Sequence, residues 1–210
     1  MTTGKNQRAQ YWKDTILSVI GSLHYTLSDV LGNVDEGFVW APSLSTLPTL
    51  PTPNSLSEVL RSRMTQQTAY FQGLSQCITA LLHVNVEKPV ELPINQVMAL
   101  LQRVLVLDLT VVHTCTIELR RTLLLLHLPT YLVTGFNLLQ TLLHALRAAM
   151  TPHAVLILAL VSSVLQAYPS HNRLHIAVYQ CLQHAPHRPG GPMRTHDDPM
   201  DPIASSDTSK

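Results

Sequence analysis

Charged and aromatic residues are scarce in this 210-residue chain, and their scarcity excludes several classes of function. Charged residues make up 13% of the sequence, against roughly 25% in an ordinary soluble domain, and the formal net charge is +1. So little charge gives no electrostatic reason to expect nucleic acid as the main partner. Aromatic residues, at 5%, are too few for a platform that stacks single-stranded RNA.

Cysteine is also rare, and the motifs of common enzymes are missing. Cys77, Cys115 and Cys181 lie far apart, which is typical of free, buried thiols in a reducing compartment. The first residues carry no apolar stretch after their charges and so do not resemble a secretory signal. The sequence contains no GxSxG, Walker or GxGxxG motif. We therefore predict that the chain is not an enzyme and needs no cofactor.

Eleven histidines raise the question of a metal site. His171 and His175 stand one helical turn apart, a separation that lets two imidazoles share an ion. The glutamate of zinc proteases is missing between them, and the sequence does not place a third ligand. Nearby candidates are His184, His187, His196 and Asp197. Because zinc needs three or four ligands, we interpret the pair as solvated surface residues and predict no metal site.

What the chain does have is leucine, concentrated over Leu92–Tyr168 and interrupted by prolines. Proline fits only the first turn of a helix or the chain just beyond its end, so Pro93, Pro129, Pro152 and Pro169 should mark helix boundaries. Apolar residues recur every three or four positions between these boundaries, as on the buried face of a helix. Stacked helices of this kind usually form scaffolds.

The same period predicts the individual helices. They are expected at about Gln10–Leu31, Ser55–Leu82, Ile94–Val106, Leu119–Leu128, Thr130–Met150, Pro152–Tyr168 and Ser170–His184. The segment Leu105–Glu118 is rich in valine and threonine, which favours a strand. A lone strand has no obvious partner, so a loop or an extended crossing is an equal alternative there.

These elements define the fold class and the domain organisation. Two-helix units of roughly 40 residues are the period of HEAT and armadillo arrays, so we predict an all-α, HEAT/armadillo-like α-solenoid fragment. It should occupy residues 10–185, after a flexible N-terminus over residues 1–9. Four prolines over residues 34–54 predict an extended loop within it. Residues 186–210 have almost no apolar content and should form a disordered tail. We expect both ends of the array to expose apolar faces that capping repeats normally cover.

Four strings of residues resemble a known family. They are YWKDTILSVIGSLHYTLSDVL (Tyr11–Leu31), ELPINQVMALLQRVL (Glu91–Leu105), RRTLLLLHLPTYLVTGFNLLQTLLHAL (Arg120–Leu146) and YPSHNRLHIAVYQCLQ (Tyr168–Gln183). These strings, and the order in which they occur, resemble those of the proline-, glutamic acid- and leucine-rich nuclear scaffold proteins. The members of this family are also called modulators of non-genomic activity of the oestrogen receptor, and their fungal counterparts are Rix-type pre-ribosome factors. The family's earlier helical repeats, proline-rich region and glutamate-rich tail are absent, so we expect a fragment of its helical domain.

The resemblance implies a function in the nucleus, in the nucleolus and nucleoplasm. It implies a non-enzymatic scaffold for ribosome biogenesis, within a complex that matures the precursor of the large ribosomal subunit and works beside rRNA spacer processing. The implied partners are a WD-repeat subunit, a helical-repeat subunit, an AAA-type remodelling ATPase and the pre-60S particle. A homodimer is also implied, and direct contact with RNA is left open.

The alternative function is that of a transcriptional coregulator. Leu139, Leu142 and Leu143 match the LxxLL pattern, whose leucines fill a groove on a nuclear receptor. The same leucines continue an apolar stripe with Phe136 and Leu146, which any buried helix would need. A docking motif must be exposed, so we predict that these leucines belong to the core.

Two further features have plain structural interpretations. Glu118, Arg120 and Arg121 are expected to form charge pairs at a helix start, although arginines can also contact RNA phosphate or an acidic partner. The nearly uncharged run Ala148–His171 reaches membrane-spanning length only by including polar residues. We predict a buried core helix there and no membrane contact. A membrane-associated protein would rest on Ala154–Leu165 alone.

Overall fold

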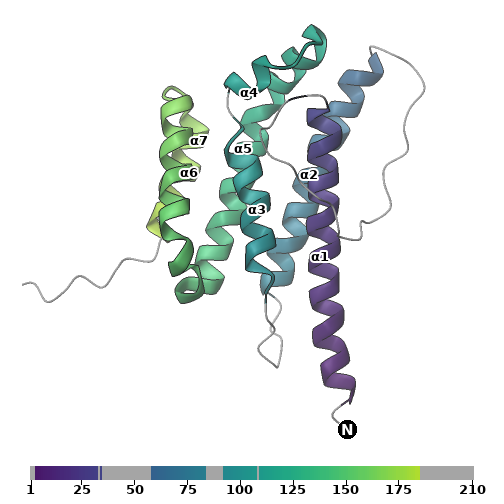
Figure 1. Cartoon of the computed structure of the whole chain (residues 1–210), viewed down its shortest axis with the longest axis vertical. Coiled ribbons are helices and arrows are strands. Elements are labelled where there is room, and N and C mark those ends of the chain that lie inside the picture. Colours follow the sequence, from purple (N-terminus) through teal and green to yellow (C-terminus); the bar gives the residue numbers. More distant parts are fainter. Residues whose placement is uncertain (1–2, 33, 35–57, 84–91, 108, 185–210) are drawn as a thin grey trace, which may run out of the picture.

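The computed structural model describes residues 3–32, 34, 58–83, 92–107 and 109–184, and Figure 1 shows their arrangement. Within these residues the chain forms seven α-helices and one 3-10 helix, and no strand. The elements are α1 (Thr3–Leu31), α2 (Glu58–His83), α3 (Ile94–Leu105), α4 (Leu109–His113), α5 (Glu118–Leu146), η1 (Arg147–His153), α6 (Ala154–Ala167) and α7 (Asn172–Gln183). The predicted all-α fold class is confirmed.

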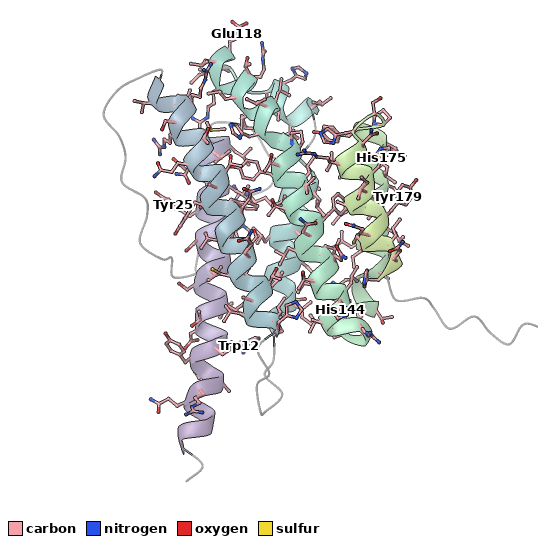
Figure 2. The ribbon with its side chains drawn as sticks, turned by 180° about the vertical axis from the view of Figure 1, so that it is seen from behind. Trp12, Tyr25, Glu118, His144, His175 and Tyr179 are labelled. Carbon is pink, nitrogen blue, oxygen red and sulfur yellow. The ribbon has the colours of Figure 1, made fainter. Side chains whose placement is uncertain are left out.

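The long helices stand side by side in two rows (Figure 1). In one row α3 contacts both α1 and α6, and in the other α5 contacts both α2 and α7. Figure 2 views the molecule from behind, with the row of α2, α5 and α7 in front. Between the rows α1 packs on α2, and α3 packs on α5. Each helix turns its apolar stripe toward its neighbours, and the buried residues form one continuous core.

Helix α5 is the centre of this core. It contacts helices of both rows, and its buried residues include Leu132 and Phe136. The Tyr131 ring meets the Phe71 ring of α2 edge to face, with ring centroids 4.9 Å apart. Gly135 brings α5 close to α3, because a Cβ at that position would lie 3.0 Å from the Val104 side chain. A larger residue would require the Val104 and Leu105 side chains to shift.

Pro129 does not divide this helix, so the predicted boundary there is wrong. It lies inside α5, which runs unbroken from Glu118 to Leu146. A proline inside a helix costs about 3 kcal/mol, since it lacks an N–H and its ring clashes with the preceding turn. Leu128, Tyr131 and Leu132 are buried beside it, and each buried apolar side chain contributes about 1.5–3 kcal/mol. Their burial outweighs the local cost.

Three other predicted boundaries also differ from the structure. Helix α1 begins at Thr3 rather than Gln10 and so includes most of the N-terminal segment predicted to be flexible. Part of Leu105–Glu118 forms the short helix α4, which neither alternative for this segment, a strand or a loop, had predicted. The chain between α5 and α6 forms η1, which includes Pro152. The predicted tail, and all of the predicted proline-rich loop except Val34, lie outside the described residues.

Candidate interaction surfaces

The C-terminal end of α1 is held by side chains from two other helices. Asp29 accepts hydrogen bonds from Arg63 on α2, at 2.5 Å from Nη2 and 3.2 Å from Nε, and from Gln67 Nε2 at 2.8 Å. Arg120 on α5 donates to the carbonyl oxygens of Asp29 and Val30. The last carbonyls of a helix have no partner within it. Arg120 therefore caps α1 from a distant part of the chain, and the predicted helix-start charge pair is not its role.

This junction does not suit a ligand. Gly32 ends α1 with a φ of 59°, and a Cβ at this position would clash with the Arg120 guanidinium. A cleft of about 60 Å³ remains between Asp29, Leu60, Arg63 and neighbouring side chains. Its arginines are already paired with Asp29 and with the carbonyls of α1. The charged groups here hold three helices together, and their donors are already engaged by Asp29 and by the carbonyls of α1.

A buried polar network joins α1 to α3. Arg103 is only 7% exposed, and its guanidinium donates to the carbonyl oxygen of His24 at 2.9 Å and to Ser28 Oγ at 3.0 Å. Burial, and secondly the nearby Arg103 charge, lower the pKa of His24 from 6.5 to about 3. His24 is therefore neutral at physiological pH, as its place in the core requires.

A second polar network joins α2 to α5. The Thr68 hydroxyl lies 2.7 Å from the carbonyl oxygen of Met64, 3.2 Å from His127 Nδ1 and 3.2 Å from the Tyr131 hydroxyl. Burial raises the pKa of Tyr131 to about 12 and lowers that of His127. Burial therefore favours the uncharged form of both groups. The network fixes the position of α2 against the centre of the core.

The leucines of the LxxLL motif lie inside the protein. Leu139 and Leu143 are 0% exposed and Leu142 is 1% exposed. The predicted burial is confirmed for these leucines and for Phe136, whereas Leu146, the last residue of the predicted stripe, is only partly buried. A receptor groove could reach these leucines only if α5 left the core.

Exposed apolar residues occur on several elements, from α1 to α7, and the last two helices carry four of them. Val155 and Leu158 on α6 are 81% and 53% exposed, and Ile176 and Tyr179 on α7 are 57% and 61% exposed. We call these four residues the terminal apolar residues. Figure 2 shows Tyr179 on the side of α7 that faces away from α5, and Tyr25 at the opposite end of the array. Both ends therefore present apolar side chains to solvent.

Two helical segments are long and apolar enough to cross a membrane. One is Glu118–Leu146, in which 56% of the apolar 18-residue window is buried, and the other is Ala149–Ala167, in which 28% of that window is buried. The first is the central core helix. The second includes α6, which packs Ile157, Leu160 and Val164 against the core but leaves Val155 and Leu158 exposed, so the prediction of a buried core helix is wrong for this face. When only one or two helices meet these criteria, length and composition are weak evidence for a membrane span, because core helices of soluble proteins meet the same criteria.

The histidine pair predicted to be solvated interacts with the backbone at the start of α7. The His171 Nδ1 atom accepts a hydrogen bond from the Leu174 N–H at 3.3 Å. The His175 Nε2 atom lies 3.0 Å from the carbonyl oxygen of Tyr168. No group of three or more possible metal ligands occurs in the described part of the chain. The other predicted candidates, His187, His196 and Asp197, lie outside it.

The three thiols differ in exposure. Cys115 and Cys181 are buried, as predicted, whereas Cys77 is exposed and the prediction is wrong for it. Burial raises the pKa of the Cys181 thiol to about 12. A cleft of about 100 Å³ between α2 and α5 is lined by uncharged polar residues such as Gln72 and Asn137. Sites for small molecules usually measure about 300–1,000 Å³, so this cleft is small for one.

Comparisons with protein-family models, with curated proteins and with solved structures find no match to this chain. The family resemblance therefore remains a prediction from the sequence.

Proposed function

We propose that this chain is a non-enzymatic scaffold built as a HEAT/armadillo-like α-solenoid. Helices pair across the two rows, α1 with α2 and, on either side of the short α4, α3 with α5. The next two helices, α6 and α7, continue the rows. In such an array each unit contacts only its neighbours, so the end units keep an apolar face available.

The terminal apolar residues are the observation that carries this proposal. Val155, Leu158, Ile176 and Tyr179 are each more than half exposed. The segment that contains α6, residues 149–167, has no charged side chain. Exposed apolar residues at such a site are typical of surfaces that a protein partner covers. The partner surface is expected to be apolar at its centre with a polar rim.

The family resemblance supplies the setting. We propose that the chain acts in the nucleus, within a Rix-type complex that matures the precursor of the large ribosomal subunit. Its proposed partners are the WD-repeat and helical-repeat subunits, a second copy of the chain, the AAA-type ATPase and the pre-60S particle. It would act through surface contact and would hold partners in place without chemistry of its own.

A pull-down from nuclear extract tests this proposal. Tagged wild-type chain is compared with a Leu158→Glu/Ile176→Glu variant and with a Tyr25→Glu control at the other end of the array. All three positions are more than half exposed, so the variants should keep their helical circular dichroism. Ribosome-assembly factors should be recovered with the wild type and the control, and lost from the double variant. Recovery of no such factor, or equal recovery with all three proteins, would contradict the proposal.

The alternative function, a coregulator that docks nuclear receptors through Leu139, Leu142 and Leu143, fits the structure less well. These leucines are buried, and docking would require part of the core to open. Recovery of receptors instead of assembly factors in the same pull-down would favour this alternative.

A further inference from the structure

The last three elements of the array, η1, α6 and α7, carry no negative side chain, and we call them the end unit. Residues 119–184, which include the end unit and nearly all of α5, contain four arginines and no aspartate or glutamate. The acidic residues in the described part of the chain are Asp14 and Asp29 on α1, Glu58 at the start of α2 and Glu118 at the start of α5. Charge is therefore distributed unevenly along the array, although the formal total is only +1.

An arginine stands beside the terminal apolar residues of α7. Arg173 and Ile176 are three positions apart, as are Ile176 and Tyr179, and residues at this spacing are neighbours on the surface of a helix. All three side chains are exposed, and Figure 2 shows Tyr179 facing away from α5. Arg173 forms no ion pair with any residue that the structure describes. Its guanidinium, which has five N–H donors, is therefore available at the edge of this apolar face.

The exposed side of α6 adds apolar area without adding charge. Val155 and Leu158 are exposed about one turn apart, and residues 149–167 include no Lys, Arg, Asp or Glu. Arg147, at the start of η1, precedes this segment and is also exposed. The end unit thus presents exposed apolar side chains, with arginines near its borders and no carboxylate among them.

This distribution of charge selects a partner by sign. A partner that covers the terminal apolar residues and carries Asp or Glu around them can pair with arginine, and it meets no like charge on the end unit. A partner with Lys or Arg in the same places meets Arg173 and finds no carboxylate to pair with. Because like charges that face each other across an interface are costly, the sign of the charge determines which partners are accepted.

Nucleic acid and lipid fit this surface less well than protein. Nucleic-acid binding gains its affinity from several Lys and Arg side chains that neutralise phosphates, whereas the end unit has only Arg147 and Arg173. A helix that lies on a membrane surface is rich in Lys and Arg on its polar face. On α6 the exposed polar residues are Ser162, Ser163 and Gln166, all uncharged.

We propose that the end unit binds an acidic protein segment, in which apolar side chains are flanked by aspartate or glutamate. The apolar side chains of this segment contact the terminal apolar residues, and its carboxylates pair with Arg173. The proposal rests on the proposed function, in which a protein partner covers these residues, and it adds the chemistry of that partner.

Selection from a random peptide library tests the proposal without assuming a natural partner. Peptides displayed on phage are selected on the full chain and counter-selected on a Leu158→Gln/Ile176→Gln variant, which removes apolar side chains without adding charge. The enriched peptides are synthesised, and their binding is measured by fluorescence anisotropy at low and high salt. Arg173→Glu is compared with the matched control Arg61→Glu. Both arginines are exposed near the start of a helix, and both substitutions change the net charge equally.

The enriched peptides should contain apolar residues together with an excess of Asp and Glu over Lys and Arg. Their binding should weaken several-fold at high salt, because salt screens charges at a surface. Arg173→Glu should weaken binding at least about fivefold, since attraction becomes repulsion, and Arg61→Glu should bind like the wild type.

Three outcomes would overturn the proposal. The first is enrichment of uncharged or basic peptides, which would leave the proposed function intact and reject only the acidic partner. The second is equal binding by the two arginine variants. The third is that no selected peptide depends on Leu158 and Ile176, while a single-stranded RNA or phosphatidylcholine vesicles tested in parallel do. The pull-down from nuclear extract decides the proposed function separately, so the two failures can be distinguished.

Discussion

Leu143 offers a direct test of whether the LxxLL leucines serve as core or as a docking motif. Its side chain is 0% exposed, near the end of the helix that contacts both rows. The substitution Leu143→Ala removes a buried isobutyl group and leaves a cavity. Such changes cost about 2–5 kcal/mol, depending on how far the surroundings relax. Since a domain is usually stable by about 5–15 kcal/mol, this single change should remove a large share of the total.

The assay is thermal and urea unfolding followed by circular dichroism, with Leu126→Ala as the control. Leu126 lies on the same helix but is 69% exposed, so its loss should change stability by no more than about 0.5 kcal/mol. For a chain of this size each kcal/mol shifts Tm by roughly 2–4 °C. Leu143→Ala should therefore lower Tm by roughly 4–20 °C, and the control should unfold like the wild type.

The result that would refute this reasoning is equal stability of the two variants. Receptor binding measured on the same preparations completes the test. If Leu143→Ala kept the wild-type Tm and lost only receptor binding, the leucine would be a docking residue and the coregulator function would be preferred. A fall in Tm with no receptor binding by any form would leave these leucines as core.

Three further outcomes are expected. Gly32→Ala should lower the free energy of unfolding by about 1–3 kcal/mol in urea titrations, because alanine strains a positive φ and meets the Arg120 guanidinium; an unchanged midpoint would argue against the cap. The pKa of His24 is about 3 in the folded chain against 6.5 for the free side chain, so between these values only the unfolded chain binds the proton and stability falls as pH falls. The loss from pH 7 to pH 5 should be about 2 kcal/mol, and its persistence in His24→Gln would assign it to other groups. Cys77 should react with a thiol reagent in the native protein, whereas Cys181 should react only on unfolding; simultaneous labelling in mass spectrometry would contradict this order.

The sequence predicted those helices whose bounds and buried faces are determined by residues close together in the chain. The period of apolar residues placed a helix at Ile94–Val106, and the structure has one at Ile94–Leu105. The last helix is likewise within two residues of its predicted start. The burial of Leu139 and Leu142 followed from the same period. In each case neighbours three or four positions apart carry the signal, so a single sequence is sufficient.

What the sequence did not predict depends on residues distant in the chain. Pro129 is a helix breaker by local rules, and only the packing of both halves of α5 overrides it. The role of Arg120 requires knowing that α5 meets the end of α1. The contact of His144 with His184 requires the packing of α5 on α7. No pattern within a few residues contains this information.

The cap that Arg120 provides also bears on how the chain is made. The arginine follows the carbonyl it binds, that of Val30, by 90 residues. A ribosome that adds about 5–20 residues per second needs roughly 5–20 s to extend the chain that far. During this time the carbonyls of Asp29 and Val30 lack their Arg120 partner, although α2, the main packing partner of α1, has already been made. The end of the first helix should therefore reach its final state only after α5 has left the ribosome.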